Sequence, residues 1–104
     1  MNGVILSFTT VSKADILVPS AFSPNGDGQN DILIPIVLGI QKFGYFMVLN
    51  RWGQVVFETR EIGKGWDGNY RGNPQPMDTY SWIVEGVDVL GKTIKKNGGA
   101  LLVR

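Results

Sequence analysis

The sequence has no cysteine and no histidine among its 104 residues. The absence of cysteine excludes disulfide bonds and thiol nucleophiles, and the absence of histidine excludes Ser–His–Asp catalysis. Without either residue type, the usual zinc sites are excluded as well. The nine acidic residues are scattered and form no carboxylate pair of the kind that glycosidases use. We therefore expect a protein that is not an enzyme and requires no cofactor.

Neither sign of charge dominates, because ten Lys and Arg residues stand against nine Asp and Glu residues, for a net charge of +1. This balance gives no electrostatic reason to expect nucleic acid or an anionic membrane as the main partner. No apolar run reaches the roughly 18 residues that a membrane helix needs, so we expect no membrane insertion. The first ten residues also lack the basic start of a signal peptide.

What the sequence does contain is turn residues, with 14 glycines and 5 prolines between short β-branched and aromatic runs. These runs cover residues 3–11, 15–19, 31–38, 44–50, 54–58, 79–89, 93–96 and 99–104. No window has the apolar period of a helix. The pattern and the length predict one domain, an all-β, immunoglobulin-like antiparallel β-sandwich of about seven strands.

Two of these runs predict specific contacts. Alternation in the run 79–89 places Tyr80, Trp82 and Val84 on the core-facing side. The run 44–50 is apolar on both faces, so it is either central and covered twice, or it presents Tyr45, Met47 and Leu49 to a partner. Between it and the run 54–58, "RWG" predicts a hairpin turn whose last residue, Gly53, has a positive φ.

The stretch "PNGDGQND" places oxygen-bearing side chains at alternate positions, with Gly26 and Gly28 between them. A calcium ion could draw oxygens from Asn25, Asp27, Gln29 and Asp31. The twelfth position of a calcium loop would be Ile36, however, so the bidentate glutamate is missing. The pattern favours a turn whose side chains bond their own backbone, with a weak calcium site as the alternative.

Two tryptophans lie in expected loops, and each has two interpretations. Trp52 follows Arg51 in the hairpin turn, where it is expected to fold back and cap the open end of the sandwich; alternatively it is a sugar platform or a partner anchor. Trp66 precedes the turn pair Asp67-Gly68 and is expected to seal the core edge, a ligand role being the alternative.

The last part of the chain is basic, with Lys92, Lys95, Lys96 and the final residue Arg104. On a strand, Lys92 and Lys96 share one face, and Lys95 lies on the other. Lysines of this kind are typical of a solvated edge strand that is guarded against pairing with other chains.

Four stretches together resemble a known family: "VPSAFSPNGDGQNDILIP", "VLNRWGQVVFET", "GWDGNYRGNPQPMDTYSWIVEGVD" and "GKTIKKNGGALLVR". They are similar to the gliding-motility-associated C-terminal domain, the type B sorting domain of the type IX secretion system in Bacteroidetes-type bacteria. The resemblance covers residues 18–104, and residues 1–17 are a preceding segment or a first strand. The matching positions are Pro24, Asn25, Gly26, Asp27, Gly28, Asn30, Asp31, Asn50, Arg51, Trp52, Gly53, Trp66, Asp67, Gly68, Tyr80 and Arg104. Asp78 departs from the pattern, since many relatives have glycine there.

The resemblance implies that the domain is a sorting signal at the C-terminus of a larger cargo protein, an adhesin or a surface enzyme. The cargo passes through the periplasm, the folded domain is recognised by the type IX machinery together with a PorP/SprF-like outer-membrane protein, and the cargo reaches the cell surface or the medium. A shared recognition surface is then expected among Arg51, Trp52, the three lysines 92, 95 and 96, and Arg104.

Two other functions fit the residues. A carbohydrate-binding or adhesive β-sandwich module would use an exposed Trp52 or Trp66. A purely structural stalk domain would leave export intact when deleted.

Overall fold

The computed structural model describes residues 14–26, 28 and 30–104. These residues form strands and connecting loops, and none of them lies in a helix that is long and apolar enough to cross a membrane. The strands are β1 (Asp15–Leu17), β2 (Ala21–Phe22), β3 (Ile36–Leu38), β4 (Ile40–Leu49), β5 (Val55–Thr59), β6 (Asn69–Tyr70), β7 (Asn73–Pro74), β8 (Asp78–Asp88) and β9 (Thr93–Leu102). The run 3–11 that we expected to be a strand lies outside the described residues.

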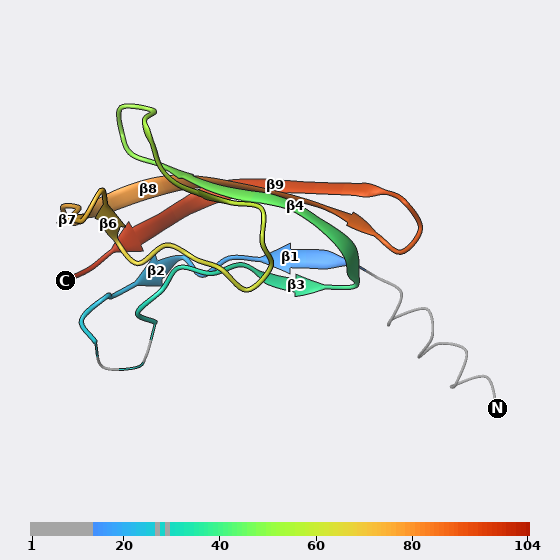
Figure 1. The fold of residues 1–104 in the computed structure, drawn as a ribbon, viewed down its shortest axis with the longest axis horizontal. Coiled ribbons are helices and arrows are strands. Elements are labelled where there is room, and N and C mark those ends of the chain that lie inside the picture. The colour runs from blue at the N-terminus through green and yellow to red at the C-terminus, as the bar shows by residue number, and fades with distance from the viewer. Residues whose placement is uncertain (1–13, 27, 29) are drawn as a thin grey trace.

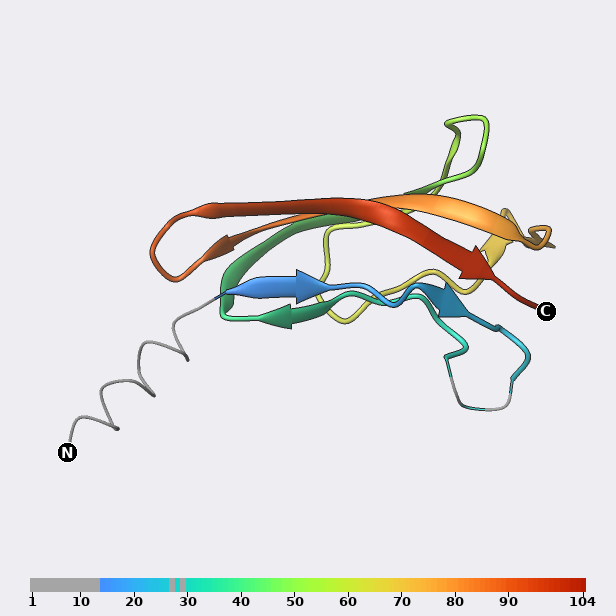
Figure 2. The same ribbon diagram turned by 180° about the vertical axis from the view of Figure 1, so that it is seen from behind.

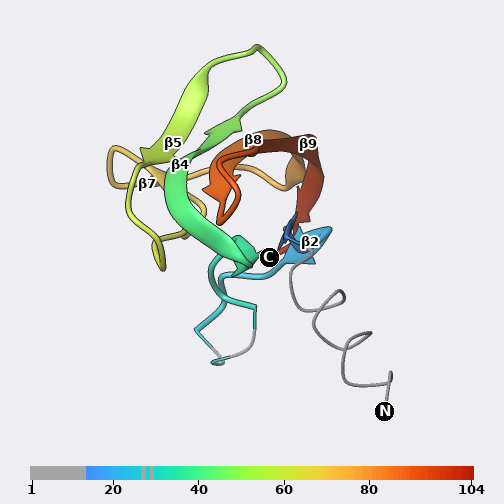
Figure 3. The same cartoon turned by 90° about the vertical axis from the view of Figure 1, so that its right-hand side faces the viewer.

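The architecture is a β-sandwich, which confirms the predicted fold class. A five-stranded sheet has the order β2-β9-β8-β4-β5, and all its neighbours are antiparallel except β2 and β9. Two small antiparallel sheets, β1-β3 and β6-β7, complete the fold. Figures 1 and 2 show β1 and β3 on one side of the large sheet, and Figure 3 shows that the large sheet curves around the core.

The alternation predicted for the run 79–89 is confirmed along β8. Tyr80, Trp82 and Val84 are 2%, 8% and 0% exposed, and they face the core. Trp66 lies beside Tyr80, with ring centroids 4.8 Å apart, and beside Phe22, at 5.5 Å. This aromatic cluster fills the sandwich where the small strands leave the second layer thin.

The two apolar faces of the central strand β4 have different surroundings. Phe46 and Val48 are fully buried in the core, whereas Tyr45, Met47 and Leu49 are half-buried on the opposite face of the sheet. Within the described part of the chain, the two small sheets pack on the core side of β4, which favours the second alternative, and binding of a partner by Tyr45, Met47 and Leu49 stays a prediction.

The C-terminal part of the chain is one continuous strand, although the sequence indicated two runs. A Cβ atom at Gly98 would lie 2.8 Å from Cζ2 of Trp82, so the glycine makes room for this ring rather than marking a turn. Pro35 interrupts the run 31–38: Leu33 forms an isolated bridge with Trp66 before the chain enters strand β3.

The long strands give the molecule two distinct ends (Figures 1 and 2). The entry end holds the start of β1 and the β8–β9 turn, residues 88–92. The motif end holds the loop 23–31, the β4–β5 turn 50–54, the segment 66–78 and Arg104. β8 alone separates the two ends by about 33 Å, at roughly 3.3 Å for each residue.

Candidate functional site: the motif end

Three of the motif segments meet at Gly68, which is buried and has a φ of +86°. A Cβ atom here would lie 3.1 Å from Cγ of Pro24, 3.2 Å from Nη2 of Arg104 and 3.3 Å from Cδ1 of Leu102. Only glycine combines this backbone conformation with so little space. The loop 23–31, the segment 66–78 and the C-terminal residue therefore form one packed unit.

Arg104 fastens this unit from the C-terminus. Its guanidinium donates from Nη2 to the carbonyl oxygen of Gly68 and from Nε to that of Gln75, both at 2.9 Å. The backbone N–H of Gln75 donates to the same Gly68 carbonyl at 2.8 Å. The planar guanidinium suits two such acceptors, because its donors point outward in a fixed fork. Arg104 thus holds the segment 66–78 in place.

Trp66 closes the core beneath this unit. It is fully buried, its Nε1 donates to the carbonyl oxygen of Asn69 at 2.8 Å, and its backbone pairs with Leu33. A buried indole of this kind has no surface to offer a ligand, so the adhesive role considered for Trp66 is wrong. Asp67 accepts a bond from the N–H of Asn69 and shapes the turn that follows.

Tyr80 supports the same segment from β8. Its hydroxyl donates to the carbonyl oxygen of Pro76 at 2.7 Å. Burial raises the pKa of the Tyr80 phenol above its usual value, and the nearby carboxylate of Asp78 adds to this effect. The neutral phenol is therefore the form that the fold stabilises.

The loop 23–31 is built around Asp31. Its carboxylate accepts bonds from the N–H groups of Gly26, at 3.0 Å, and Gly28, at 2.8 Å. Both oxygens thus accept bonds from the backbone of the preceding loop residues, as expected of a turn whose side chains bond their own backbone. Asp27 and Gln29 lie outside the described residues, and the described part of the chain contains no cluster of three acidic side chains that could hold a metal. Calcium binding by Asn25, Asp27, Gln29 and Asp31 stays a prediction.

The β4–β5 turn is ordered by Asn50. Its Oδ1 accepts bonds from the N–H groups of Trp52 and Gln54, both at 2.9 Å, and its Nδ2 donates to the Gln54 side chain. Gly53 has a φ of +79°, which confirms the predicted turn. The result is a turn with little freedom, although its residues are exposed.

Arg51 ties the turn to the first residue of β8. Its Nε lies 2.8 Å from Oδ2 of Asp78, and its Nη2 donates to Oδ1 at 3.3 Å. This hydrogen bond, together with one from the N–H of Thr79, lowers the pKa of the Asp78 carboxyl below its usual 3.8. Asp78 lies 27 residues from Arg51 in the sequence, so the sequence alone gave no reason to pair them.

Trp52 does not cap the sandwich, and the expectation that it would is wrong. Its side chain is 81% exposed, because the Asn50 bonds turn the third residue of the turn outward and the core edge is already closed by Trp66. The guanidinium carbon of Arg51 lies 5.8 Å from the ring centroid.

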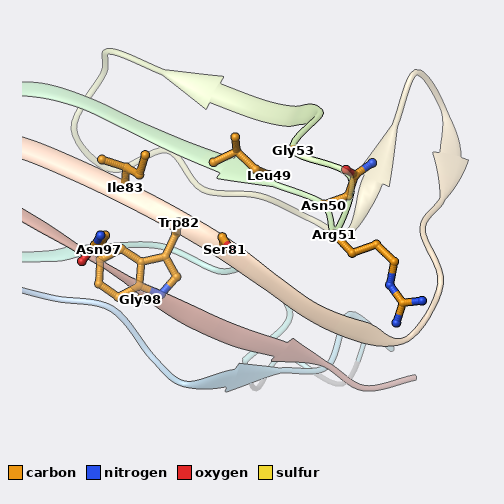
Figure 4. Close-up of a pocket in the computed structure, with 9 residues that line it drawn as sticks. All are labelled: Leu49, Asn50, Arg51, Gly53, Ser81, Trp82, Ile83, Asn97 and Gly98. Carbon is orange, nitrogen blue, oxygen red and sulfur yellow. The ribbon is translucent and has the colours of Figure 1, made fainter.

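Two hollows flank Arg51. One of about 260 Å³ lies between the turn and the segment 75–80, and Trp52 and Met77 are part of its wall. The other, of about 490 Å³, crosses the outer face of the large sheet. Figure 4 shows Leu49 and Ile83 projecting on this outer face, while the Trp82 indole points the opposite way.

The three lysines that we grouped with the motif, Lys92, Lys95 and Lys96, do not lie at this end, in contrast to Arg51 and Arg104. Lys92 closes the β8–β9 turn at the entry end, and Lys95 lies opposite Glu85 on the outer face. Lys96 forms an ion pair with Asp15 of β1. β2 pairs only with Leu101 and Leu102, so the lysine-bearing half of β9 lies along an edge, as expected.

Comparison with known proteins gives one match. Residues 16–101 match a family model described as the CHU_C Type IX secretion signal domain. No curated protein and no solved structure matches the chain. The matched range includes the loop 23–31, the turn 50–54 and the segment 66–78, so it contains most of the motif end described above.

Proposed function

Since the chain belongs to the CHU_C family of type IX secretion signal domains, we propose that the secretion machinery recognises this domain in its folded form, at the motif end. Membership gives the general role. The domain is a C-terminal sorting signal, it interacts with the type IX machinery, and it directs the larger protein of which it is part to the cell surface or the extracellular space. A secretion signal domain family is not catalytic.

One observation is the main support for recognition of the folded domain by the machinery. Pro24, Gly68 and Arg104 are far apart in the sequence and come into contact only in the folded chain. An unfolded chain would present these residues singly. The motif end also lies at the opposite end of the molecule from the start of β1, so a partner could reach it while a cargo that precedes the domain remains folded (Figure 1).

The partner that we propose is an outer-membrane protein of the PorP/SprF-like kind, because the sequence motifs are similar to those of type B sorting domains. The domain would meet this partner in the periplasm, after the cargo has crossed the inner membrane. An adhesin or a surface enzyme is the cargo that fits this route.

The test is a secretion assay in a bacterium that has a type IX system. A fluorescent protein with a signal peptide is joined to residues 1–104, and fluorescence is measured outside the cells, in the periplasm and on the surface. A second fusion carries residues 93–104 alone, and a third carries Trp66→Ala, which removes a buried indole worth about 3–5 kcal/mol of folding free energy.

We expect export of the complete domain, and we expect both other fusions to remain in the periplasm. Export should stop when the translocon or the PorP/SprF-like protein is deleted. Export of the fusion with residues 93–104 alone would contradict recognition of the fold. Failure of the complete, folded domain to leave the cell would contradict the proposal as a whole.

A further inference from the structure

Trp52 lies on the surface of the domain and is not part of its hydrophobic core. Trp52 is 81% exposed, and its indole has no described hydrogen bond. Transfer of apolar surface out of water is favourable by roughly 25 cal/mol for each Å² that is buried. Exposure alone does not identify a binding site, so the structure around Trp52 has to be considered as well.

The turn that carries Trp52 is held rigidly. Asn50 accepts two backbone N–H bonds within it, and Arg51 fastens it to Asp78 through two contacts. A preorganised side chain loses little conformational freedom on binding, which leaves more of the interaction energy for affinity. Tryptophan and arginine are also the residues most enriched at binding hot spots.

The surroundings of the ring favour a protein over a sugar. Sugar hydroxyls donate hydrogen bonds as well as accept them, but the side-chain acceptors of Asp78 and Asn50 beside the ring are engaged within the domain. Both oxygens of Asp78 accept bonds, from Arg51 and from the N–H of Thr79, and Asn50 is committed to the turn. The hollow beside Trp52 is also lined by Met77, which is 60% exposed and apolar.

We propose that Trp52 is the anchor by which the sorting machinery holds this domain, inserting into an apolar pocket of a folded protein partner. This inference rests on the proposed function and adds the contact residue and the chemistry of the partner. Met77 extends the apolar contact. Arg51 uses two of its nitrogen atoms for Asp78, and its remaining N–H groups reach an acceptor at the rim of the pocket.

The chain supplies a matched control in Leu90. It is also 81% exposed, and it is also the third residue of a five-residue hairpin turn, at the entry end. Trp52→Ala and Leu90→Ala therefore remove equally exposed apolar side chains from similar backbone. Both variants should unfold at nearly the same denaturant concentration as the wild type, because surface changes usually shift stability by less than about 0.5 kcal/mol.

The two substitutions are made in the fluorescent fusion that carries the complete domain, and export and unfolding are measured together. We expect Trp52→Ala to reduce export strongly, since loss of a hot-spot side chain weakens binding about 30-fold or more. Leu90→Ala should export like the wild type. With Trp52 left in place, a photo-crosslinking amino acid at position 77 on the same hollow, and not at position 90, should attach to the PorP/SprF-like protein in exporting cells.

The outcomes separate this inference from the proposed function. Normal export of Trp52→Ala would overturn the anchor and leave the sorting role intact, whereas failure of the wild-type fusion would overturn the sorting role itself. If Trp52→Ala left export unchanged but abolished adhesion of cells to glycans, the anchor would again be wrong, and the adhesive module would be favoured.

Discussion

The molecule contains the same five-residue turn twice, once at each end. Residues 50–54 connect β4 to β5, and residues 88–92 connect β8 to β9. In each turn the N–H of the first residue donates to the carbonyl oxygen of the fifth at 2.9 Å, and the N–H of the fourth donates to the carbonyl oxygen of the first at 3.0 Å. The fourth residue is a glycine with a φ near +80° in both, Gly53 and Gly91.

The side chain of the first residue accepts the same hydrogen bonds in both turns. Oδ1 of Asn50 and Oδ1 of Asp88 each accept bonds from the N–H groups of the third and fifth residues, at 2.9 Å. The third residue is turned outward as a consequence, and Trp52 and Leu90 are both 81% exposed. Exposure at this position is therefore a property of the turn, and exposure alone does not identify a function.

The difference between the turns lies in their surroundings. Among the described residues, an ion pair braces the turn at the motif end, between Arg51 and Asp78, and none braces the other turn, whose second residue is Val89. Two hollows flank the braced turn, and it lies beside the unit fastened by Arg104. This comparison indicates that recognition depends on a rigid neighbourhood, in which an exposed side chain is only one part.

Glycine substitutions at the two ends are expected to give the largest difference in the free energy of unfolding. Gly68 and Gly91 have similar φ angles, +86° and +83°, but only Gly68 is crowded by neighbouring atoms. Gly91→Ala should lower the free energy of unfolding by about 1–2 kcal/mol through backbone strain alone. Gly68→Ala should lower it by about 3 kcal/mol or more, because a methyl group must also displace packed atoms.

Urea unfolding of the two glycine variants measures this difference, provided that the slope of the transition stays constant. Gly53→Ala is a further control, since Gly53 has a positive φ and open space around it. Equal losses for Gly68→Ala and Gly91→Ala would mean that the three motif segments are not packed together at Gly68.

A smaller effect should be shared by the two turns. Asn50→Ala and Asp88→Ala each remove an acceptor of two backbone N–H bonds, and each should lower the free energy of unfolding by about 1–2 kcal/mol. Export should fall in Asn50→Ala and not in Asp88→Ala, because the first substitution removes hydrogen bonds that hold the turn carrying Trp52. The measurement is denaturation alongside the secretion assay, and similar export of the two variants would argue against a role for turn rigidity.

The fold class was predictable from the sequence because its signals are local. Alternation along β8 identified Tyr80, Trp82 and Val84 as core, and the position of Gly53 identified the hairpin turn. The joining of the runs 93–96 and 99–104 into β9 was not predictable. Gly98 between them makes room for the Trp82 ring of the neighbouring strand, and the residues next to Gly98 in the sequence do not indicate this contact.

The motif end was predictable only in part. Its residues were recognised as motif positions, but their division into buried supports and an exposed anchor depends on tertiary contacts. Trp52 and Trp66 both lie near glycine in polar loops, yet one is 81% exposed and the other is fully buried. The partner of Arg51 was missed because Asp78 is distant in sequence. The repeated turn did leave a signal: Asn50 and Asp88 are each followed by glycine three residues later.

The smallest effect concerns the ion pair that distinguishes the two turns. The hydrogen bond from Arg51 lowers the pKa of Asp78 below 3.8, so Arg51→Ala should raise that pKa toward 3.8. A lowered pKa in the folded state gives stability that is present above the unfolded pKa and is lost as the pH falls through the folded pKa. The contribution should therefore disappear only in acid, and an NMR titration of the Asp78 carboxyl would record the shift. Arg71→Ala is the control, because Arg71 lies over the ring of Tyr70 and has no described contact with Asp78. An unchanged Asp78 pKa in Arg51→Ala would show that the pair does not persist in solution and that the turn carrying Trp52 is no better braced than the turn carrying Leu90.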